Sequence, residues 1–246
     1  SKITPNFGIM PKKFLTIKLI KMSKVSCVIC AYNEEERIAN VLSVVVKHKD
    51  IDEIIVVDDG SKDKTVEVVK KFPTARLISL PVNKGKSFAL AIGVSFAEGK
   101  IIMLLDADLV GLSENNISQL IEPVIYGQAD MSISLRENSL LIYKMIGLDF
   151  VSGERVFYKD FLSKSLEEIK TLKSYEVEVF MNKIIIKKKL RLKIVKWNNV
   201  ISLRKSAKVG LWKGILGEIT MILQILKSVS LFEIVRQNYK MLRLSK

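Results

Sequence analysis

The chain has 246 residues, 48% of them hydrophobic, and a formal net charge of +14. This length and composition allow a substantial buried core, in one large domain or in one domain with an appendage. The most apolar long stretch, 215–235, contains two glutamates, a glutamine and a lysine, so we do not expect it to cross a bilayer. Lysines scattered through the first 21 residues break up any apolar signal segment, so a cytoplasmic location is expected.

The charge is distributed unevenly along the chain. Residues 1–179 carry 24 basic and 24 acidic side chains, whereas residues 180–246 carry 16 basic side chains and only Glu218 and Glu233 as acids. Such asymmetry indicates a separate task for the C-terminal part, usually contact with an anionic surface or partner.

Residues 1–22 do not fit the pattern that follows and are expected to be an N-terminal extension. From residue 25 onward, short β-rich apolar runs alternate with helical segments, which predicts βαβ units and a mostly parallel sheet. The expected strands are 25–30, 53–58, 76–80 and 100–106, and the expected helices are 34–47, 65–72 and 87–98. Asn33 and Glu36 are spaced as a capping box for the first helix.

After residue 108 the alternation weakens. We expect a helix over 114–126, a strand over 130–135, an irregular stretch over 139–150, a helix over 175–188 and a strand over 193–197. A last amphipathic helix is predicted from apolar residues at three/four spacing, namely Trp212, Ile215, Leu216, Ile219, Ile222, Leu223 and Leu226.

Two pairs of acids follow predicted buried strands. Asp58 and Asp59 come after one apolar run, and Asp106 and Asp108 come after another. In open α/β sheets ligands bind at the carboxyl ends of the strands, so both pairs are expected at the binding edge. Several carboxylates repel an anionic ligand unless a divalent cation bridges them, so the pattern predicts a polyphosphate held through Mg²⁺ or Mn²⁺.

Two common nucleotide-binding motifs are absent from the sequence. No GxGxxG follows the first predicted strand, and the segment 83–87 has the GKS ending of a P-loop without its upstream glycine. Gly85 and Lys86 nevertheless lie between a strand and a helix start, where amides and an ammonium can meet phosphate oxygens.

Four motifs in order together resemble the family 2 glycosyltransferases with the GT-A fold, over roughly residues 25–200. They are Cys30-Ala31-Tyr32-Asn33-Glu34-Glu35, Ile54 to Ser61 with Asp63 and Thr65, Asn83-Lys84-Gly85-Lys86 with Ala89-Leu90, and Leu105-Asp106-Ala107-Asp108. The resemblance implies a Rossmann-like, mostly parallel sheet flanked by helices. It also implies that Ala31, Tyr32, Glu34 and Asp58 or Asp59 hold the nucleoside, that Gly85 and Lys86 lie near the diphosphate, and that Asp106 and Asp108 hold sugar nucleotide and metal.

The second half of the sequence resembles one subgroup of this family more closely. Residues 151–157 are similar to the SGxR segment on the acceptor side of polyprenyl-phosphate glycosyltransferases, the dolichyl-phosphate mannose synthase type, and residues 174–179 are similar to their GYxxE segment. The chain departs from these patterns at Ser174 and at Glu154. Glu154 also resembles the SGE segment of glucosyl-3-phosphoglycerate synthases, which leaves the acceptor open.

The expected mechanism depends on the acceptor. A lipid phosphate is already an anionic nucleophile, so catalysis would rest on positioning and metal electrostatics, with Arg155 and the cluster Arg204, Lys205 and Lys208 receiving the phosphate. A hydroxyl acceptor would need a base, for which Glu154 and Glu178 are the candidates. A buried ion pair is the alternative role of Arg155 and Glu178.

The sequence therefore predicts an extension (1–22), a GT-A domain (23–200) and a basic amphipathic C-terminal region (201–246) that associates with the inner face of the cell membrane. The expected partners are a nucleotide sugar, a polyprenyl phosphate or other lipid acceptor, and the anionic membrane surface. An alternative reaction is transfer to a small soluble acceptor or a glycan hydroxyl. Two alternative classes of protein are a non-catalytic relative that binds the nucleotide sugar and a basic nucleic-acid-binding protein. The last is disfavoured because the basic tail has few interleaved aromatic residues.

Overall fold

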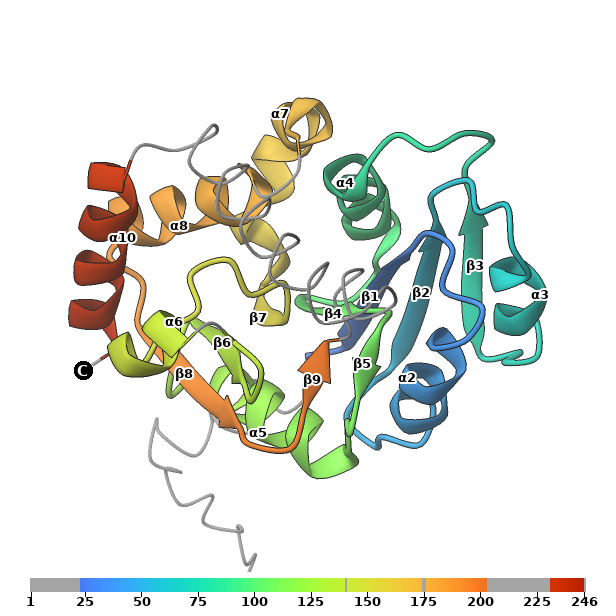
Figure 1. Ribbon diagram of the computed structural model, residues 1–246, viewed down its shortest axis with the longest axis horizontal. Coiled ribbons are helices and arrows are strands. Elements are labelled where there is room, and N and C mark those ends of the chain that lie inside the picture. Colours follow the sequence, from blue (N-terminus) through green and yellow to red (C-terminus); the bar gives the residue numbers. More distant parts are fainter. Residues whose placement is uncertain (1–22, 140, 174–175, 203–230, 246) are drawn as a thin grey trace, which may run out of the picture.

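The computed structural model describes residues 23–139, 141–173, 176–202 and 231–245. In these ranges a seven-stranded sheet lies at the centre, and helices cover both of its faces (Figure 1). The strands of this sheet are β1 (Val25–Ala31), β2 (Glu53–Asp58), β3 (Ala75–Ser79), β4 (Ile101–Asp106), β6 (Met131–Arg136), β7 (Arg155–Tyr158) and β8 (Leu192–Trp197). A separate pair is formed by β5 (Leu109–Val110) and β9 (Ile201–Ser202).

The strand order is β3-β2-β1-β4-β7-β6-β8, and every neighbouring pair is parallel except the two that involve β7. The mostly parallel α/β sheet predicted from the sequence is therefore confirmed. Strand β7 was not predicted, and it inserts antiparallel between β4 and β6. Its apolar run is only Val156 and Phe157, too short to indicate a strand in the sequence, and its neighbours supply the hydrogen bonds that define it.

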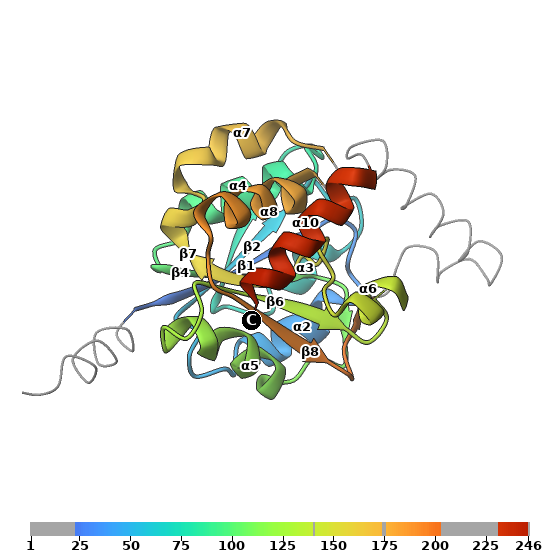
Figure 2. The same ribbon diagram turned by 90° about the vertical axis from the view of Figure 1, so that its left-hand side faces the viewer.

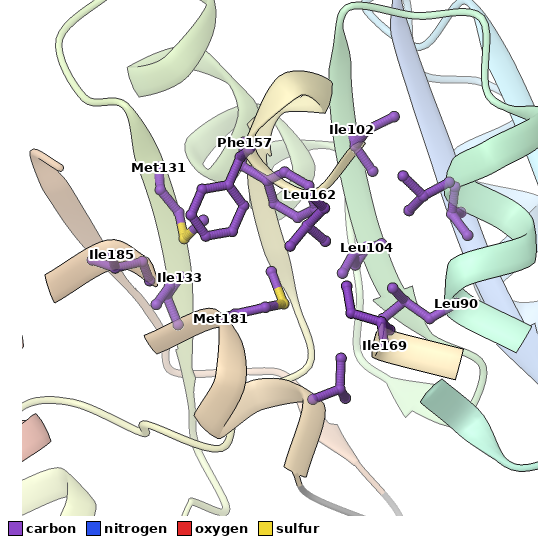
Figure 3. Packing of buried hydrophobic residues seen from close by; sticks show 14 of the residues in the cluster. Leu90, Ile102, Leu104, Met131, Ile133, Phe157, Leu162, Ile169, Met181 and Ile185 are labelled. Carbon is purple, nitrogen blue, oxygen red and sulfur yellow. The ribbon is translucent and has the colours of Figure 1, made fainter. Parts of the chain in front are cut away.

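One face of the sheet packs against α4 (Lys86–Phe96), α7 (Leu166–Thr171), α8 (Glu176–Lys188) and α10 (Leu231–Leu244). Figure 3 shows this core, in which Leu90 of α4 and Met181 of α8 meet Leu104 and Phe157 of the sheet. All four side chains are buried, so the burial of this apolar surface holds the C-terminal helices on the same face as α4.

The opposite face packs against α2 (Ile38–Val45), α3 (Thr65–Val69) and α5 (Glu114–Ile125). Helix α5 has the clearest start of these, because the Ser113 side chain and Asn116 form a reciprocal capping box. The two cysteines lie on opposite sides of the sheet: Cys27 belongs to this core and Cys30 packs against the other, and both thiols are free.

Several predictions for the second half need correction. The stretch 139–150, expected to be irregular, contains α6 (Leu141–Ile146). Helix α7 was not predicted because half of its six residues are charged and it buries only Ile169. Helix α10 was also not predicted; it packs beside α8 in both views (Figures 1 and 2). The predicted amphipathic helix with Trp212 to Leu226 lies outside the described residues.

The sheet topology fixes the place where a ligand can bind. The chain runs from β1 outward through β2 to β3, and then returns to place β4 on the other side of β1. Such a reversal of strand order opens a crevice at the carboxyl ends of the two central strands. No helix in the described ranges is long and apolar enough to cross a membrane.

Candidate active site

The predicted acidic residues meet at the carboxyl end of the sheet. In the parallel registers Ala31 of β1 lies opposite Asp58 of β2, and Cys30 lies opposite Asp106 of β4. The backbone amide of Asp59 donates to the carbonyl of Ala31 at 2.8 Å, which ties the ends of β1 and β2 together. The acids that end β2 and β4 therefore lie on either side of the end of β1, at one edge of the sheet.

The loop after β1 is fastened to the loop after β2. The amide of Asn33 donates to the Ser61 hydroxyl at 2.9 Å, and the Asn33 side chain accepts from the amide of Lys62 at 2.8 Å. The next amide, that of Glu34, donates to the Thr65 hydroxyl at 2.8 Å. Tyr32, which is half-buried, begins this loop and so lies at the crevice as the motif implied.

This fastening corrects the predicted start of the first helix. Asn33 has a φ of 56°, which lies in the left-handed region, and helix α2 begins only at Ile38 with Arg37 as its N-cap. Asn33 and Glu36 therefore form no capping box, because the Asn33 side chain bonds the neighbouring loop instead. The Glu34 carboxylate accepts a hydrogen bond from Arg37 at 2.6 Å.

Asp58 and Asp59 are almost fully buried, with 2% and 3% of their surfaces exposed. Asp59 accepts the backbone amides of Lys84 and Gly85 at 2.7 and 2.8 Å, and Asp58 accepts the amide of Ser61 at 3.3 Å. The Gly85 amide, predicted to face a phosphate, therefore serves to anchor Asp59. Gly85 has a φ of 94°, a conformation that disfavours other residues.

Lys86, the first residue of α4, lies between two carboxylates. Its ammonium is 2.8 Å from Asp106 Oδ1 and 3.2 Å from Glu178 Oε1. Burial alone would lower the pKa of Lys86, but the two acids outweigh burial and raise it well above its usual value. Lys86 is therefore charged at physiological pH, and a third N–H remains for a ligand.

Gly153 makes this arrangement possible. A Cβ atom at this position would lie 2.7 Å from both Asp106 Oδ1 and the Lys86 ammonium. Only glycine lets the segment before β7 approach the ion pair so closely. The same residues, with Cys30 and Glu178, line a pocket beneath the crevice.

The second oxygen of Asp106 faces Arg136, a site residue that the sequence analysis missed. Arg136 ends β6 and donates to Glu154 Oε1 at 2.8 Å and to Asp106 Oδ2 at 3.4 Å. Burial alone would raise the pKa of Asp106, but Lys86 and Arg136 lower it to about 2. The one signal in the sequence was a cation at the end of the buried run Met131 to Leu135.

Glu154 is fully buried beneath this ion pair. Its second oxygen accepts the hydroxyls of Ser134 and Ser152 at 2.7 and 2.8 Å. Burial raises its pKa, and Arg136 opposes that effect. Glu154 thus anchors Arg136, a different position from the acceptor contact expected of it.

The surroundings of Arg155 also differ from the predicted contact with an acceptor phosphate. Its guanidinium is fully buried and donates to the carbonyls of Ser152 and Phe150 and to the Asn182 side chain at 2.8 to 2.9 Å. Burial lowers its pKa to about 10. These contacts tie β7 to α8, and they engage three of the five N–H donors that were expected to receive an acceptor phosphate. The other residues predicted to bind the acceptor, Arg204, Lys205 and Lys208, lie outside the described residues.

Asp108 is placed differently from Asp106. Its carboxylate accepts the Ser202 hydroxyl at 2.8 Å and, within the described chain, has no cation within 4 Å. Burial and the nearby charge of Asp106 raise its pKa to about 6. An acid in this environment gains from a divalent cation, because the cation supplies the missing positive charge.

The donor set fits a cation that is completed by substrate. In the described ranges no group of three His, Cys, Asp or Glu side chains could hold a metal by itself. Mg²⁺ is commonly bound through one or two carboxylates together with substrate phosphates. Asp108 suits that role, whereas Asp106, also predicted as a metal ligand, has both oxygens engaged by Lys86 and Arg136.

Comparison with known proteins agrees with this architecture. A mostly parallel α/β sheet flanked by helices, with acids at the carboxyl ends of its central strands, is the arrangement expected of the GT-A fold. The model of the family described as Glycosyl transferase family 2 matches residues 26–140. An uncharacterized protein of Methanocaldococcus jannaschii, MJ1222, is 31% identical over 212 residues, which cover 76% of this chain and 84% of that protein. The chain belongs to glycosyl transferase family 2.

Relatives with described activities match over shorter stretches. A dolichyl-phosphate beta-glucosyltransferase of Trichomonas vaginalis is 41% identical over 96 residues, which cover 34% of this chain and 30% of that protein. The human dolichyl-phosphate beta-glucosyltransferase is 37% identical over 100 residues, or 35% of this chain and 31% of that protein. The chain thus spans about a third of the length of these relatives.

Among solved structures, glucosyl-3-phosphoglycerate synthase from Mycobacterium tuberculosis in complex with Mn²⁺ and UDP-glucose has a TM-score of 0.65. It is 21% identical in sequence, with 92% of this chain and 84% of that chain covered. At this identity the likeness establishes the shared fold, which confirms the predicted GT-A architecture.

Proposed function

We propose that this protein is a divalent-metal-dependent glycosyltransferase that moves a sugar from a nucleotide-sugar donor to a polyprenyl phosphate. The observation that carries the proposal is the unequal pair Asp106 and Asp108: Asp106 is paired with two cations, while Asp108 has no cation within 4 Å among the residues that the structure describes. This pair provides a fixed ammonium for a diphosphate and a separate acid for Mg²⁺ or Mn²⁺.

The donor nucleoside would lie in the crevice between β1 and β2. Ala31 and Tyr32 would form its wall, and Glu34, Asp58 and Asp59 would accept hydrogen bonds from base and ribose. The fastened loops support this role because they hold these groups in place before the donor arrives. Lys86 would then contact the diphosphate with its remaining N–H group.

Asp108 would hold the cation against that diphosphate, with Asp106 positioning Lys86. When bound, Mg²⁺ or Mn²⁺ stabilises the charge that develops on the leaving diphosphate. Lys86 adds a second positive charge at the same place, and its two carboxylate partners restrict its motion. The chain thereby assists departure of the nucleotide without a side chain that forms a covalent intermediate.

The surroundings of the two candidate bases, Glu154 and Glu178, bear on the choice of acceptor. Glu154 is fully buried against Arg136, and Glu178 is 3% exposed and paired with Lys86. Both carboxylates are thus engaged in ion pairs, and a phosphate acceptor is already an anion and needs no base. The dolichyl-phosphate relatives are consistent with such an acceptor. A small soluble acceptor, as in the glucosyl-3-phosphoglycerate synthase neighbour, is the alternative.

Contact with an anionic leaflet would supply the lipid acceptor. Six basic residues at the end of α8 and along β8 are exposed: Lys187, Lys188, Lys189, Arg191, Lys193 and Lys196. Arg191 is bound to Asp130, which leaves five lysines, and each cation near an anionic surface contributes about 1 kcal/mol of attraction. We propose peripheral binding at the inner face of the cell membrane, with residues 201–246 as the associating region.

The test combines donor screening with one substitution. UDP- and GDP-sugars are screened by thermal shift with Mn²⁺ or Mg²⁺, and transfer is then assayed with polyprenyl phosphate in vesicles and with 3-phosphoglycerate. Asp108→Asn is expected to lower transfer at least about 100-fold while the melting temperature is unchanged or higher, because a partly buried charge is removed. Full activity of this variant contradicts the metal role, and transfer to 3-phosphoglycerate alone contradicts the lipid acceptor.

A further inference from the structure

The hydroxyl of Ser202 lies beside the proposed cation ligand although 94 residues separate the two in sequence. Strands β5 and β9 pair antiparallel, with Leu109 opposite Ser202 and Val110 opposite Ile201 (Figure 1). Because Leu109 follows Asp108 directly, this register sets Ser202 against the Asp108 carboxylate. No role of Ser202 is evident from the sequence, in which it lies in an unremarkable stretch.

A second set of contacts fixes the backbone of Ser202. The Asn138 side chain donates to the Ser202 carbonyl at 2.7 Å and accepts the Ser202 amide at 3.2 Å. Asn138 follows β6 by two residues, so this clamp connects β9 to the strand that ends in Arg136. A side-chain amide that hydrogen-bonds both the N–H and the C=O of one residue mimics the pairing of a neighbouring strand. Such a clamp leaves the backbone of that residue little freedom.

The turn before β9 is anchored as well. Asn199 donates to the Gly111 carbonyl at 3.2 Å and accepts from Asn116 at 3.3 Å, and the Val200 carbonyl accepts the Glu137 amide at 3.0 Å. The position of Ser202 is therefore set from β5, from α5 and from the end of β6. A hydroxyl held this firmly is suited to a fixed task at the site.

The distance between the two oxygens suits a shared cation. Ser202 Oγ lies 2.8 Å from Asp108 Oδ2. Adjacent ligands of an octahedral cation with bonds of about 2.1 Å are about 3 Å apart. A hydroxyl has two lone pairs besides its hydrogen, so Ser202 can donate to Asp108 and still offer a lone pair to a metal. Among the described residues Asp108 has no paired cation, and a second protein oxygen beside it would raise the affinity of the site for a metal.

We infer that the Ser202 hydroxyl is a second oxygen ligand of the divalent cation, presented beside Asp108 by Asn138 and by the pairing of β5 with β9. The inference rests on the proposed function and deepens it. It makes the metal site composite, with one ligand from the end of β4 and another from the strand β9. Assembly of the cation site then requires the pairing of β5 with β9, not only the Asp-Ala-Asp tripeptide.

Direct metal binding tests this inference. The affinity for Mn²⁺, alone and with UDP, is measured on the full chain from the electron paramagnetic resonance signal of free Mn²⁺. Ser202→Ala is expected to weaken Mn²⁺ binding about 10-fold or more. Loss of a residue that supports a metal ligand reduces metal affinity by a similar factor. Ser202→Thr keeps the hydroxyl and is expected to bind within about 3-fold of the native affinity, while Asn138→Ala weakens binding in the same direction as Ser202→Ala.

Ser26→Ala is the matched control. It removes a hydroxyl–carboxylate hydrogen bond to Glu53 at the other end of β1, so it reports any loss of Mn²⁺ affinity that comes from general destabilisation. Native affinity in folded Ser202→Ala overturns the inference and leaves the proposed function standing. Absence of Mn²⁺ binding by the native protein, even with UDP, overturns both.

Discussion

Two pairs of buried acids, one at the end of β2 and the other before β7 and on α8, are held by different means. In the half that contains β1 to β4, Asp58 and Asp59 accept backbone amides from nearby loops. In the half that contains β6, β7 and α8, Glu154 and Glu178 are paired with Arg136 and Lys86. An acid held by amides finds its hydrogen bonds in the backbone, whereas a buried ion pair depends on both members being present.

This difference separates two tasks at the crevice. The amide-bound acids order the loops that would enclose a nucleoside. The ion pairs fix the charges that would face a diphosphate and an acceptor, whereas Asp108 has no cation within 4 Å in the described part of the chain. The comparison predicts that single substitutions in the second half disturb the fold more strongly.

The largest effect is expected for Glu154→Ala. The substitution leaves the Arg136 guanidinium buried without its closest partner, and breaking a buried pair in this way costs about 3–5 kcal/mol of unfolding free energy. Chemical denaturation measures this loss. Glu154→Gln keeps an acceptor for Arg136 and is expected to lose less; equal losses for the two variants would show that the charge of Glu154 is immaterial.

A smaller loss is expected for Asp59→Ala. The amides of Lys84 and Gly85 lose their acceptor, but Lys84 is exposed, so water replaces part of the interaction. We expect a cost of about 1–3 kcal/mol, with Asp59→Asn intermediate. If Asp59→Ala destabilised the protein as much as Glu154→Ala, the contrast between the two halves would not hold.

The smallest effect concerns a contact that joins the two halves. His48, after α2, accepts the Asp50 amide through Nδ1 at 3.3 Å, so Nε2 carries the hydrogen and donates to Ser118 of α5 at 2.9 Å. Burial lowers the pKa of His48. The neutral ring is therefore favoured in the folded state, and its contribution is present above the unfolded pKa of about 6.5 and is lost as the pH falls below it.

The measurement is the unfolding free energy between pH 5 and 8 for the native protein and for His48→Gln. The native curve is expected to fall more steeply below about pH 6.5 than the variant curve, because glutamine does not titrate in this range. Parallel curves would mean that His48 does not couple α2 to α5 through its neutral form.

The sequence alone determined the half of the sheet that contains β1 to β4. The strands around Ile55, Ile29 and Leu104 are short apolar runs with local turn signals, and their acids follow directly in the chain, so pattern and motif were sufficient to predict both sheet and crevice. The start of the first helix was not determined in this way. Asn33 fits a capping pattern in the sequence, but in the structure its side chain accepts the Lys62 amide of the next loop instead.

Tertiary structure decided the second half. Arg136 reaches Glu154 from a strand 18 residues away, Lys86 reaches Glu178 from another helix, and β7 becomes a strand only between its two neighbours. Such pairings have no local signature, because either member alone resembles an ordinary surface charge. The sequence names the acids of the candidate site, but which of them is paired with a cation depends on contacts that form only when the distant strands and helices pack together.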